Sequence, residues 1–229
     1  MLTPFMCGYN RGMANADQST LVRDLLATAG RSYAAEAGIE LTDKPAPLYQ
    51  TMVLSLLLST RIKASIAVAA THELVRSGLG TARKMRAASW QERVAALGRA
   101  HYVRYDESTA TALGRGAQLL LDDYGGDPRR LRARAAGEPA RVRELLRAFP
   151  RIGPVGADIF CREVQSIWPE LRPYLDVKAL DGARLLGLPT DAATLAPLVP
   201  GEDLARFAAA LVRVALDKKL AGTLRQSNG

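Results

Sequence analysis

Apolar residues recur at intervals of three and four along most of this chain, the spacing that lets an α-helix bury one face. No segment alternates apolar and polar residues with the Val, Ile and aromatic enrichment typical of strands. The pattern therefore predicts an all-α protein. The expected helices are at about 18–35, 48–60, 62–77, 90–98, 105–123, 127–136, 139–148, 154–167, 175–187 and 202–220.

Two of these segments differ from ordinary amphipathic helices. Tyr49 to Thr60 (YQTMVLSLLLST) is apolar nearly all round, which predicts a helix buried at the centre of a bundle. The segment 129–151 is instead rich in arginine and contains only Glu138 and Glu144 as acidic residues. Its arginines are Arg129, Arg130, Arg132, Arg134, Arg141, Arg143, Arg147 and Arg151.

The whole chain, like this segment, is basic. Its 229 residues carry 31 Lys and Arg against 23 Asp and Glu, a formal charge of +8. Such a balance favours a polyanionic partner, nucleic acid first and an anionic membrane second. A solvated arginine surface is the alternative, but the clustering of arginine before residue 151 favours a binding role.

Cysteine usage and hydropathy exclude other classes. Cys7 and Cys161 are the two cysteines, too few for a disulfide framework or a four-cysteine metal site, and Cys161 is expected to be a buried thiol. The longest apolar stretch, near MVLSLLLS, is too short to cross a bilayer. We expect a cytoplasmic monomer with no membrane partner, associated with the nucleoid if bacterial. The sequence leaves open whether Met1 or Met13 is the natural start.

A tight turn follows the arginine-rich segment, in FPRIGPVGADIF at 149–160. Pro150 ends the preceding helix because it cannot continue one. Gly153 allows a sharp turn and a close approach by another surface, and Pro154 suits the first position of a new helix. The small Gly156 and Ala157 allow this helix to pack closely on the preceding one. The predicted hairpin presents a helix N-terminus that can bind phosphate.

FPRIGPVGAD resembles the helix-hairpin-helix element, whose usual pattern is Leu-Pro-Gly-Ile/Val-Gly followed by x-x-x-Ala. The matching residues are Phe149, Pro150, Ile152, Gly153 and Ala157. Arg151 departs from the pattern, because it stands where the first glycine is expected and takes a positive φ only at a cost. It can instead place a cation beside the same phosphate. A glycine-broken helical turn without a ligand is the alternative.

Three further blocks resemble endonuclease III-like DNA glycosylases, of the helix-hairpin-helix-GPD superfamily. They are LLLSTRIK at 56–63, GRAHYVRYDES at 98–108 and WPELRPYLDVKALDGARLLGLP at 168–189. With the hairpin, they follow in the family's order over about 45–190. The resemblance implies a two-lobed fold with a six-helix barrel at 45–165, including the hairpin at about 140–165. The second lobe combines 1–44 with 166–229, its C-terminal helix packing on the N-terminal one.

The resemblance also implies a reaction, the excision of a damaged base from double-stranded DNA. Asp176 matches the aspartate that stabilises the oxocarbenium-like sugar or activates water, and a helix N-cap is the alternative role for it. Val155 stands where strand-cutting relatives have a lysine, so hydrolysis with weak or absent lyase activity is expected. Lys178 lies near Asp176 in sequence and is not assigned that chemistry.

The remaining expected roles concern DNA. The residues expected to bind it are Arg147, Arg151, Ile152, Gly153, Pro154, Gly156 and Lys178. The residues expected to fill the gap left by the flipped nucleotide, or to line its pocket, are Arg61, His101, Tyr102 and Val155. His101 as an ordinary loop residue and Arg61 as a helix-end cation are the alternatives.

Some features of the family are absent or open. The chain lacks the closely spaced C-terminal cysteines that hold a [4Fe–4S] cluster in typical relatives, so no iron–sulfur cofactor is expected. The damaged base is not specified by the sequence. Two other hypotheses remain, a DNA-binding protein that has lost catalysis and a basic helical scaffold for membranes or proteins.

Overall fold

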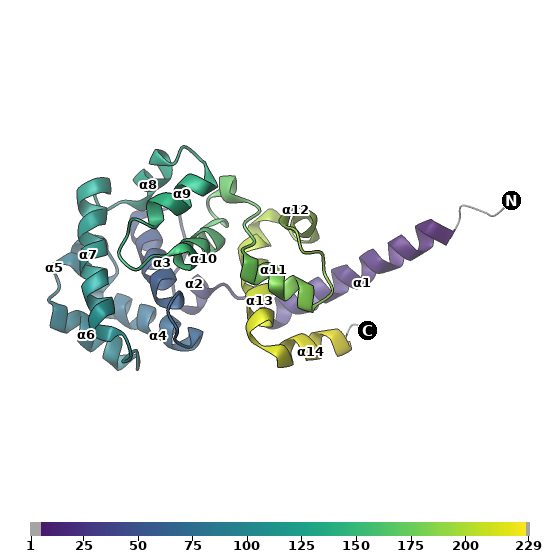
Figure 1. Ribbon diagram of the computed structural model, residues 1–229, viewed down its shortest axis with the longest axis horizontal. Coiled ribbons are helices and arrows are strands. Elements are labelled where there is room, and N and C mark those ends of the chain that lie inside the picture. The colour runs from purple at the N-terminus through teal and green to yellow at the C-terminus, as the bar shows by residue number, and fades with distance from the viewer. Residues whose placement is uncertain (1–5, 228–229) are drawn as a thin grey trace. The chain divides into compact units, whose positions relative to one another are not determined.

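The computed structural model describes the backbone of residues 6–227 and the side chains of residues 18–227. Over residues 6–227 the chain forms helices and turns and contains no strand, so the all-α prediction is confirmed (Figure 1). Within the same range, we find no helix with both the length and the apolar character needed to span a bilayer.

The chain divides into two compact units, which we describe separately. One unit is Ser32–Arg172, and the other combines the chain up to Arg31 with the chain from Pro173 onward. The boundaries therefore lie near 31 and 172, rather than near 44 and 165 as the sequence suggested. Ala34 donates its backbone N–H to the buried Glu163 Oε2 at 2.8 Å, which ties the segment after Arg31 to α10 (Pro154–Val164).

The helices of the 32–172 unit largely match the sequence pattern (Figure 1). They are α2 (Tyr33–Glu36), α3 (Pro45–Leu58), α4 (Ala64–Leu74), α5 (Ala82–Ala87), α6 (Trp90–Arg99), α7 (Asp106–Tyr124), α8 (Pro128–Arg134), α9 (Pro139–Leu146) and α10, with a π-helical turn at Val75–Leu79 and a 3₁₀ turn at Pro169–Leu171. Helix α5 was not predicted, because six residues are too few to show helical periodicity.

Helix α3 is the buried centre of this unit. Residues Leu48 to Leu57 are buried except Gln50, and α3 contacts α4, α8 and α10 (Figure 1). The buried hydroxyls of Thr51 and Ser55 donate to the carbonyls of Pro47 and Thr51, so no water is needed to satisfy them. The predicted buried central helix is confirmed.

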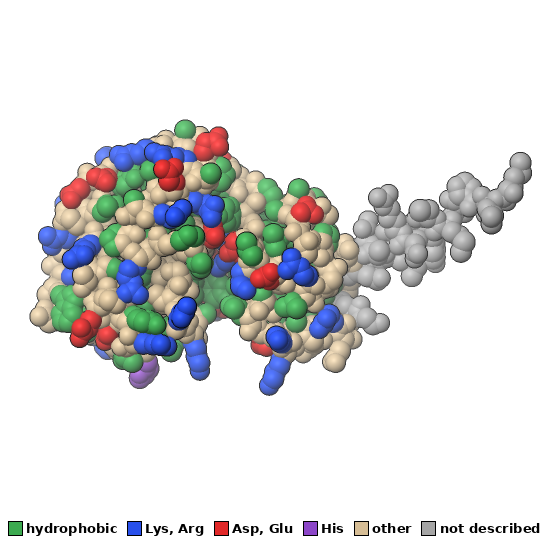
Figure 2. Space-filling view, in the orientation of Figure 1, with side chains coloured by type: hydrophobic (Ala, Val, Ile, Leu, Met, Phe, Trp, Pro, Cys, Tyr) green, Lys and Arg blue, Asp and Glu red, His purple; other side chains and the backbone are tan. Residues whose placement is uncertain are grey.

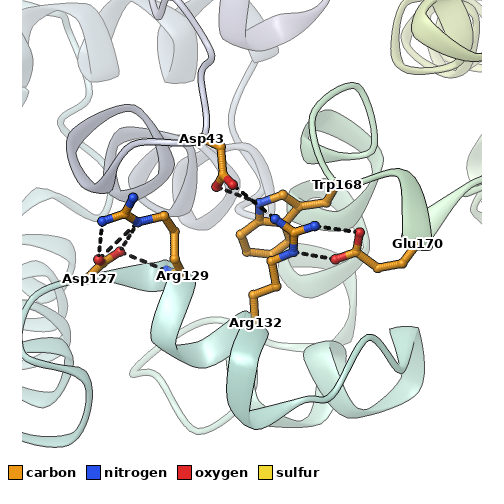
Figure 3. A network of polar contacts seen from close by, with 6 residues as sticks. All are labelled: Asp43, Asp127, Arg129, Arg132, Trp168 and Glu170. Atoms are coloured by element: carbon orange, nitrogen blue, oxygen red, sulfur yellow. Dashed lines mark hydrogen bonds and ion pairs between the residues drawn. The ribbon is translucent and has the colours of Figure 1, made fainter.

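A polar network links α8 to the segments that contain Asp43 and Trp168–Glu170 (Figure 3). The Arg132 guanidinium donates to both carboxylate oxygens of Glu170, at 2.5 and 2.8 Å, and to Asp43 at 3.0 Å. It also lies 5.2 Å from the ring centroid of the buried Trp168, whose Nε1 donates to Asp43. One arginine therefore joins segments 43–45 and 168–170 to α8 within the 32–172 unit.

The second unit contains α1 (Met6–Ala29), α11 (Val177–Leu185), α12 (Ala192–Leu195), α13 (Leu204–Leu216) and α14 (Lys218–Ser227), with 3₁₀ turns at Ala196–Leu198 and Gly201–Asp203. Helices α11 and α13 pack closely because a Cβ on Gly182 would lie 1.9 Å from the carbonyl oxygen of Leu211. Only glycine fits at this crossing.

Helix α13 also holds the C-terminal end of α1. Arg213 donates to the carbonyls of Ala29 and Arg31, and Arg206 donates to that of Gly30. Arginine side chains thus satisfy carbonyls that the helix itself leaves without a donor. The two chain ends form one unit through these bonds.

Two predicted helices are each two helices in the structure. The segment 18–35 breaks at Gly30, and α2 restarts after Ser32, whose side chain accepts from the Ala35 amide. The segment 202–220 breaks at Asp217, whose carboxylate accepts from the amides of Lys219 and Leu220. A polar cap can restart a helix without interrupting the apolar periodicity, so the pattern alone did not show the breaks. Helix α12, only four residues long, was also not predicted.

The Arg132 network yields a stability prediction. Arg132→Ala should lower the free energy of unfolding by about 1–3 kcal/mol, because it leaves the largely buried Glu170 carboxylate without its partner. Urea unfolding followed by circular dichroism measures the change. Arg130→Ala, at an exposed site on the same helix, is the matched control and should change stability by less than about 0.5 kcal/mol. Equal losses in both variants would contradict the assignment.

Candidate nucleic-acid interface

The hairpin between α9 and α10 is formed as the sequence suggested, but the residue with left-handed backbone angles in its turn is not a glycine. Arg151 has φ of 64°, in the left-handed region, whereas Gly153 is extended at φ −82° and ψ −171°. The expected glycine position of the turn is thus occupied by an arginine that adopts the glycine-like conformation. The backbone angles of Gly153 are open to any residue, so the left-handed position of the turn is Arg151 and not Gly153.

The inner face of the hairpin packs on the core of the 32–172 unit. Phe149 and Ile152 are buried, and the Phe149 ring stacks on Tyr124 with centroids 6.0 Å apart. A Cβ on Gly156 would lie 3.3 Å from Ile152 Cγ2 and 3.4 Å from Ser59 Oγ. Gly156 therefore allows α10 to lie close to Ser59 at the C-terminal end of α3, whereas the sequence predicted close packing on the preceding helix.

The outer face of the hairpin is open. Gly153 and Pro154 are exposed, Val155 is 61% exposed, and a Cβ on Gly153 would meet no atom within 4 Å. The amides of Val155 and Gly156 belong to the first turn of α10, where an α-helix supplies no acceptor. This arrangement suits an anion that approaches the helix N-terminus.

Most of the predicted arginine cluster is engaged within the protein. Arg129 pairs with Asp127, Arg132 with Glu170 and Asp43, Arg141 with Glu144, Arg143 with Asp158, and Arg134 lies over the ring of Tyr124. Figure 2 accordingly shows basic side chains interspersed with acidic and apolar ones, not one continuous patch. Arg147 is exposed and makes no ion pair with any residue whose side chain the structure describes.

The loop after α6 contains the second group of predicted residues. His101 is exposed and has φ of 58°, another left-handed non-glycine residue. Tyr102 is fully buried, and its hydroxyl lies 3.1 Å from Thr60 Oγ1 and 3.4 Å from Thr109 Oγ1. Tyr102 is therefore a core residue, and its predicted place in the gap left by a flipped nucleotide is corrected.

Val103, which the sequence reasoning did not select, is the exposed apolar residue of this loop, with 64% of its surface accessible. The available signal was the single valine among His101, Tyr102, Arg104 and Tyr105. The exposed Arg61 lies in the turn after α3, next to Thr60, so the Thr60–Tyr102 contact brings the Arg61 turn and the His101 loop together.

A carboxylate anchors the start of the His101 loop. The buried Glu73 of α4 accepts hydrogen bonds from Arg76 at 2.9 Å, from Arg99 at 2.5 Å and from Ser77 at 3.2 Å. Arg99 is the last residue of α6. The bonds from Arg76, and then those from Arg99, lower the pKa of Glu73 to about 2. No local sequence signal identifies this long-range partner.

In the other unit, Asp176 is the N-cap of α11. Its Oδ1 accepts from the Ala179 amide at 2.9 Å, and the residue is half-buried. Lys178, predicted to contact DNA, forms an ion pair of 3.1 Å with Asp181, which also pairs with Arg184. Hydrogen bonding from Lys178 lowers the pKa of Asp181. The cap role of Asp176 is thus observed, and its catalytic role stays a prediction.

The structure describes the side chain of one of the two cysteines. Cys161 is fully buried in α10, as predicted, whereas the side chain of Cys7, like Met1 and Met13, lies outside the described residues. Among the described side chains, we find no group of three or more His, Cys, Asp or Glu residues that could hold a metal ion.

Comparison with known proteins gives structural matches only. No protein-family model and no curated protein matches this chain. A non-covalent endonuclease III–DNA complex is 15% identical, with a TM-score of 0.53 over 93% of this chain and 85% of that chain. A trapped endonuclease III–DNA covalent intermediate, an estranged-adenine complex, is also 15% identical, with a TM-score of 0.50 and the same coverage.

These similarities show the fold. The chain has the helical fold of endonuclease III, and the predicted all-α fold is confirmed. At 15% identity the matches assign no residue a role.

The Glu73 anchor predicts a pH-dependent contribution to stability. Its pKa falls on folding from about 4.5 to about 2, so its stabilisation is complete above the unfolded value and is lost as the pH falls toward 2. The stability difference between the wild type and Glu73→Gln should therefore be constant at neutral pH and shrink below about pH 4.5. Urea unfolding from pH 2.5 to 7 measures this difference.

Glu144→Gln is the control, because Glu144 is exposed and pairs with the exposed Arg141. It should change stability little at neutral pH. A Glu73→Gln deficit that stays the same at every pH would contradict a contribution from the Glu73 charge.

Proposed function

We propose that this protein is a DNA base-excision repair glycosylase that hydrolyses the N-glycosidic bond of a damaged base flipped out of duplex DNA. The observation that carries the proposal is the hairpin, whose left-handed turn at Arg151 leaves the N-terminus of α10 open to an anion. Two solved structures with this fold are endonuclease III–DNA complexes, which supports DNA as the partner.

The proposed phosphate contacts come from the outer face of the hairpin. The amides at the start of α10 offer donors without sequence preference, and Gly153 leaves the space that a phosphate needs. Arg147 adds a cation that is not committed to a described carboxylate. Fixing the backbone in this way positions the duplex for base flipping.

The proposed wedge is the loop after α6, with the Arg61 turn beside it. A flipped nucleotide leaves a gap in the base stack, and apolar side chains inserted from a loop can occupy such a gap. Val103 supplies an exposed apolar surface, and His101 and Arg61 supply planar groups that can stack or donate hydrogen bonds. This assigns to Val103 the part first given to Tyr102.

The proposed chemistry uses Asp176. Cleavage of the glycosidic bond builds positive charge on the sugar, which an ionised carboxylate stabilises, and the same group can orient an attacking water. Capping α11 fixes the position of the carboxylate through the Ala179 amide, and a carboxylate can accept more than one hydrogen bond. Cap and catalytic group are therefore compatible roles for one residue.

The proposed reaction is hydrolysis without strand cleavage. Val155 has no amine to attack the sugar, and the Lys178 amine is engaged by Asp181. We further propose that the enzyme works as a cytoplasmic monomer without a cofactor. Its substrate is a damaged base of a kind still to be identified, with oxidised pyrimidines, mispaired adenine and alkylated bases as the candidates.

One observation favours a second candidate function, a DNA-binding protein without catalysis. The cap bond to Ala179 gives Asp176 a structural role that needs no reaction to explain it. The hairpin would then bind DNA in the same way, and no base would be released.

The catalytic assignment predicts the effect of Asp176→Asn. Asparagine caps helices about as well as aspartate, so the fold should be kept while base release falls by about 10²-fold or more. Duplexes with thymine glycol, uracil, adenine opposite 8-oxoguanine or an alkylated purine are incubated with protein and then treated with or without hot alkali. Wild-type strand breaks should appear only after alkali.

Asp181→Asn, on the same helix, is the matched control and should retain base release. Breaks without alkali would contradict hydrolysis as the only reaction and direct attention to Lys178. Salt-sensitive DNA binding without base release from any of these duplexes would favour the second candidate.

The phosphate assignment predicts a change in the salt dependence of binding. Arg147→Ala should reduce the slope of log K against log salt by about 0.9, the value for one lost phosphate contact. Fluorescence anisotropy with a duplex containing an abasic-site analogue measures the slope. Arg134→Ala should leave it unchanged, because Arg134 lies over Tyr124 and donates to the Asp123 carbonyl. Equal slopes for Arg147→Ala and the wild type would exclude this contact.

A further inference from the structure

The Arg151 side chain points back to the protein. Its Nη1 donates to Ser108 Oγ at 2.5 Å, and its guanidinium carbon lies 5.7 Å from the ring centroid of Tyr105. Both partners lie where α7 begins, directly after the loop that contains His101 and Val103. The contact therefore joins the hairpin turn to a second loop that is 43 residues away from it in sequence.

The partners of Arg151 are themselves linked. Ser108 Oγ donates to the Tyr105 carbonyl at 3.1 Å while it accepts from Arg151. The guanidinium of Arg104 lies 5.3 Å from the centroid of the same Tyr105 ring. Rings within about 6 Å of a cation attract it through their negative face. Arg151 thus contacts the end of this loop through a hydroxyl and a ring.

The backbone conformation at Arg151 is one that glycine usually adopts, so the presence of a long side chain there needs a reason. Three non-glycine residues have positive φ among the described residues, namely His101, Ala136 and Arg151. Two of the three lie in the loops that the Arg151 side chain connects. A glycine would adopt the angles of Arg151 without strain but would have no side chain to reach Ser108. The arginine keeps the turn and adds the link.

We propose that Arg151 is a positioning residue that joins the hairpin and the 101–105 loop into one DNA-binding surface, and does not itself bind phosphate. The proposal rests on the proposed function, and it replaces the earlier expectation that Arg151 contacts DNA. The hairpin holds the backbone of the duplex, and the link keeps the loop with Val103 at a fixed distance from it. Binding of the DNA backbone by the hairpin and insertion of the loop into the base stack then occur together.

The first test needs no DNA. Amide hydrogen exchange is measured by mass spectrometry on the full chain, comparing the wild type with Arg151→Gly, Ser108→Ala and the double variant. Exchange over 101–110 should become about tenfold faster in Arg151→Gly, because the link no longer restrains local opening. The double variant should exchange no faster than Arg151→Gly, since both changes remove one contact. Exchange over 64–74, in α4, should be unchanged.

Two more variants separate the link from the strain of the turn. Asparagine tolerates positive φ but is too short to reach Ser108, so Arg151→Asn should behave like Arg151→Gly. Lysine can still donate to Ser108, so Arg151→Lys should restore part of the protection. The melting temperature of Arg151→Gly should not fall below that of the wild type, because glycine relieves the strained angle.

The second test uses DNA and distinguishes positioning from phosphate binding. Affinity is measured for an intact duplex and for a duplex with an abasic-site analogue. Arg151→Gly should lower the preference for the abasic duplex about threefold to tenfold, as for loss of an interaction of ordinary strength. The salt slope should stay at the wild-type value, in contrast to Arg147→Ala.

Unchanged exchange over 101–110 in Arg151→Gly would overturn the proposal, whether or not the protein binds DNA. A salt slope reduced as in Arg147→Ala would also overturn it, because Arg151 would then be a phosphate ligand. If the wild type binds no duplex, the proposed function is wrong, and the exchange result alone decides whether the link holds the loop.

Discussion

The burial of α3 is the constraint on which the proposed interface depends. This helix is apolar nearly all round and lies against α4, α8 and α10, so its position is fixed by the core itself. Its C-terminal end reaches the surface at Ser59 and Thr60. Ser59 lies against Gly156 of the hairpin, and Thr60 lies within hydrogen-bond distance of Tyr102. One helix end therefore sets the positions of the Arg61 turn, the His101 loop and the hairpin.

Rigid support for these loops comes from buried or partly buried polar contacts and from apolar packing. Glu73 anchors Arg99 at the start of the His101 loop, and the buried Tyr102 anchors its middle. The buried Phe149 and Ile152 fix the inner face of the hairpin on the core. A loop held at several points loses little conformational entropy on binding, which favours a preformed surface over one that orders on contact.

Many charged side chains of this protein form contacts that stabilise the fold. The chain is basic, yet most arginines of the 129–151 segment pair with carboxylates or lie over aromatic rings. Arg132 shows the consequence, since its guanidinium contacts Asp43, Trp168 and Glu170 together and joins three segments of one unit. Net charge therefore pointed to the class of partner that we propose but overstated how many arginines are available to bind it.

Local signals in the sequence determined the helical class, the buried centre and the hairpin. Apolar spacing, the all-apolar Tyr49–Thr60 segment and the Pro150–Pro154 punctuation each act within a few residues, so they can be recognised without knowing what lies nearby in space. The Asp176 cap was predicted for the same reason. Helix breaks at Gly30 and Asp217 were missed, because the caps that cause them leave the apolar periodicity intact.

Tertiary structure alone decided which side chains are exposed and which are engaged. Tyr102 and Val103 are neighbours in one loop, yet one is buried and the other open, because the partners of Tyr102 come from residues 60 and 109. Arg151 was expected to face a phosphate, but Ser108 and Tyr105 lie within its reach. The sequence by itself determined the fold class and the place of the hairpin. Only the fold determined the partners of each long polar side chain, because those partners are far away in sequence and compete with solvent for the same group.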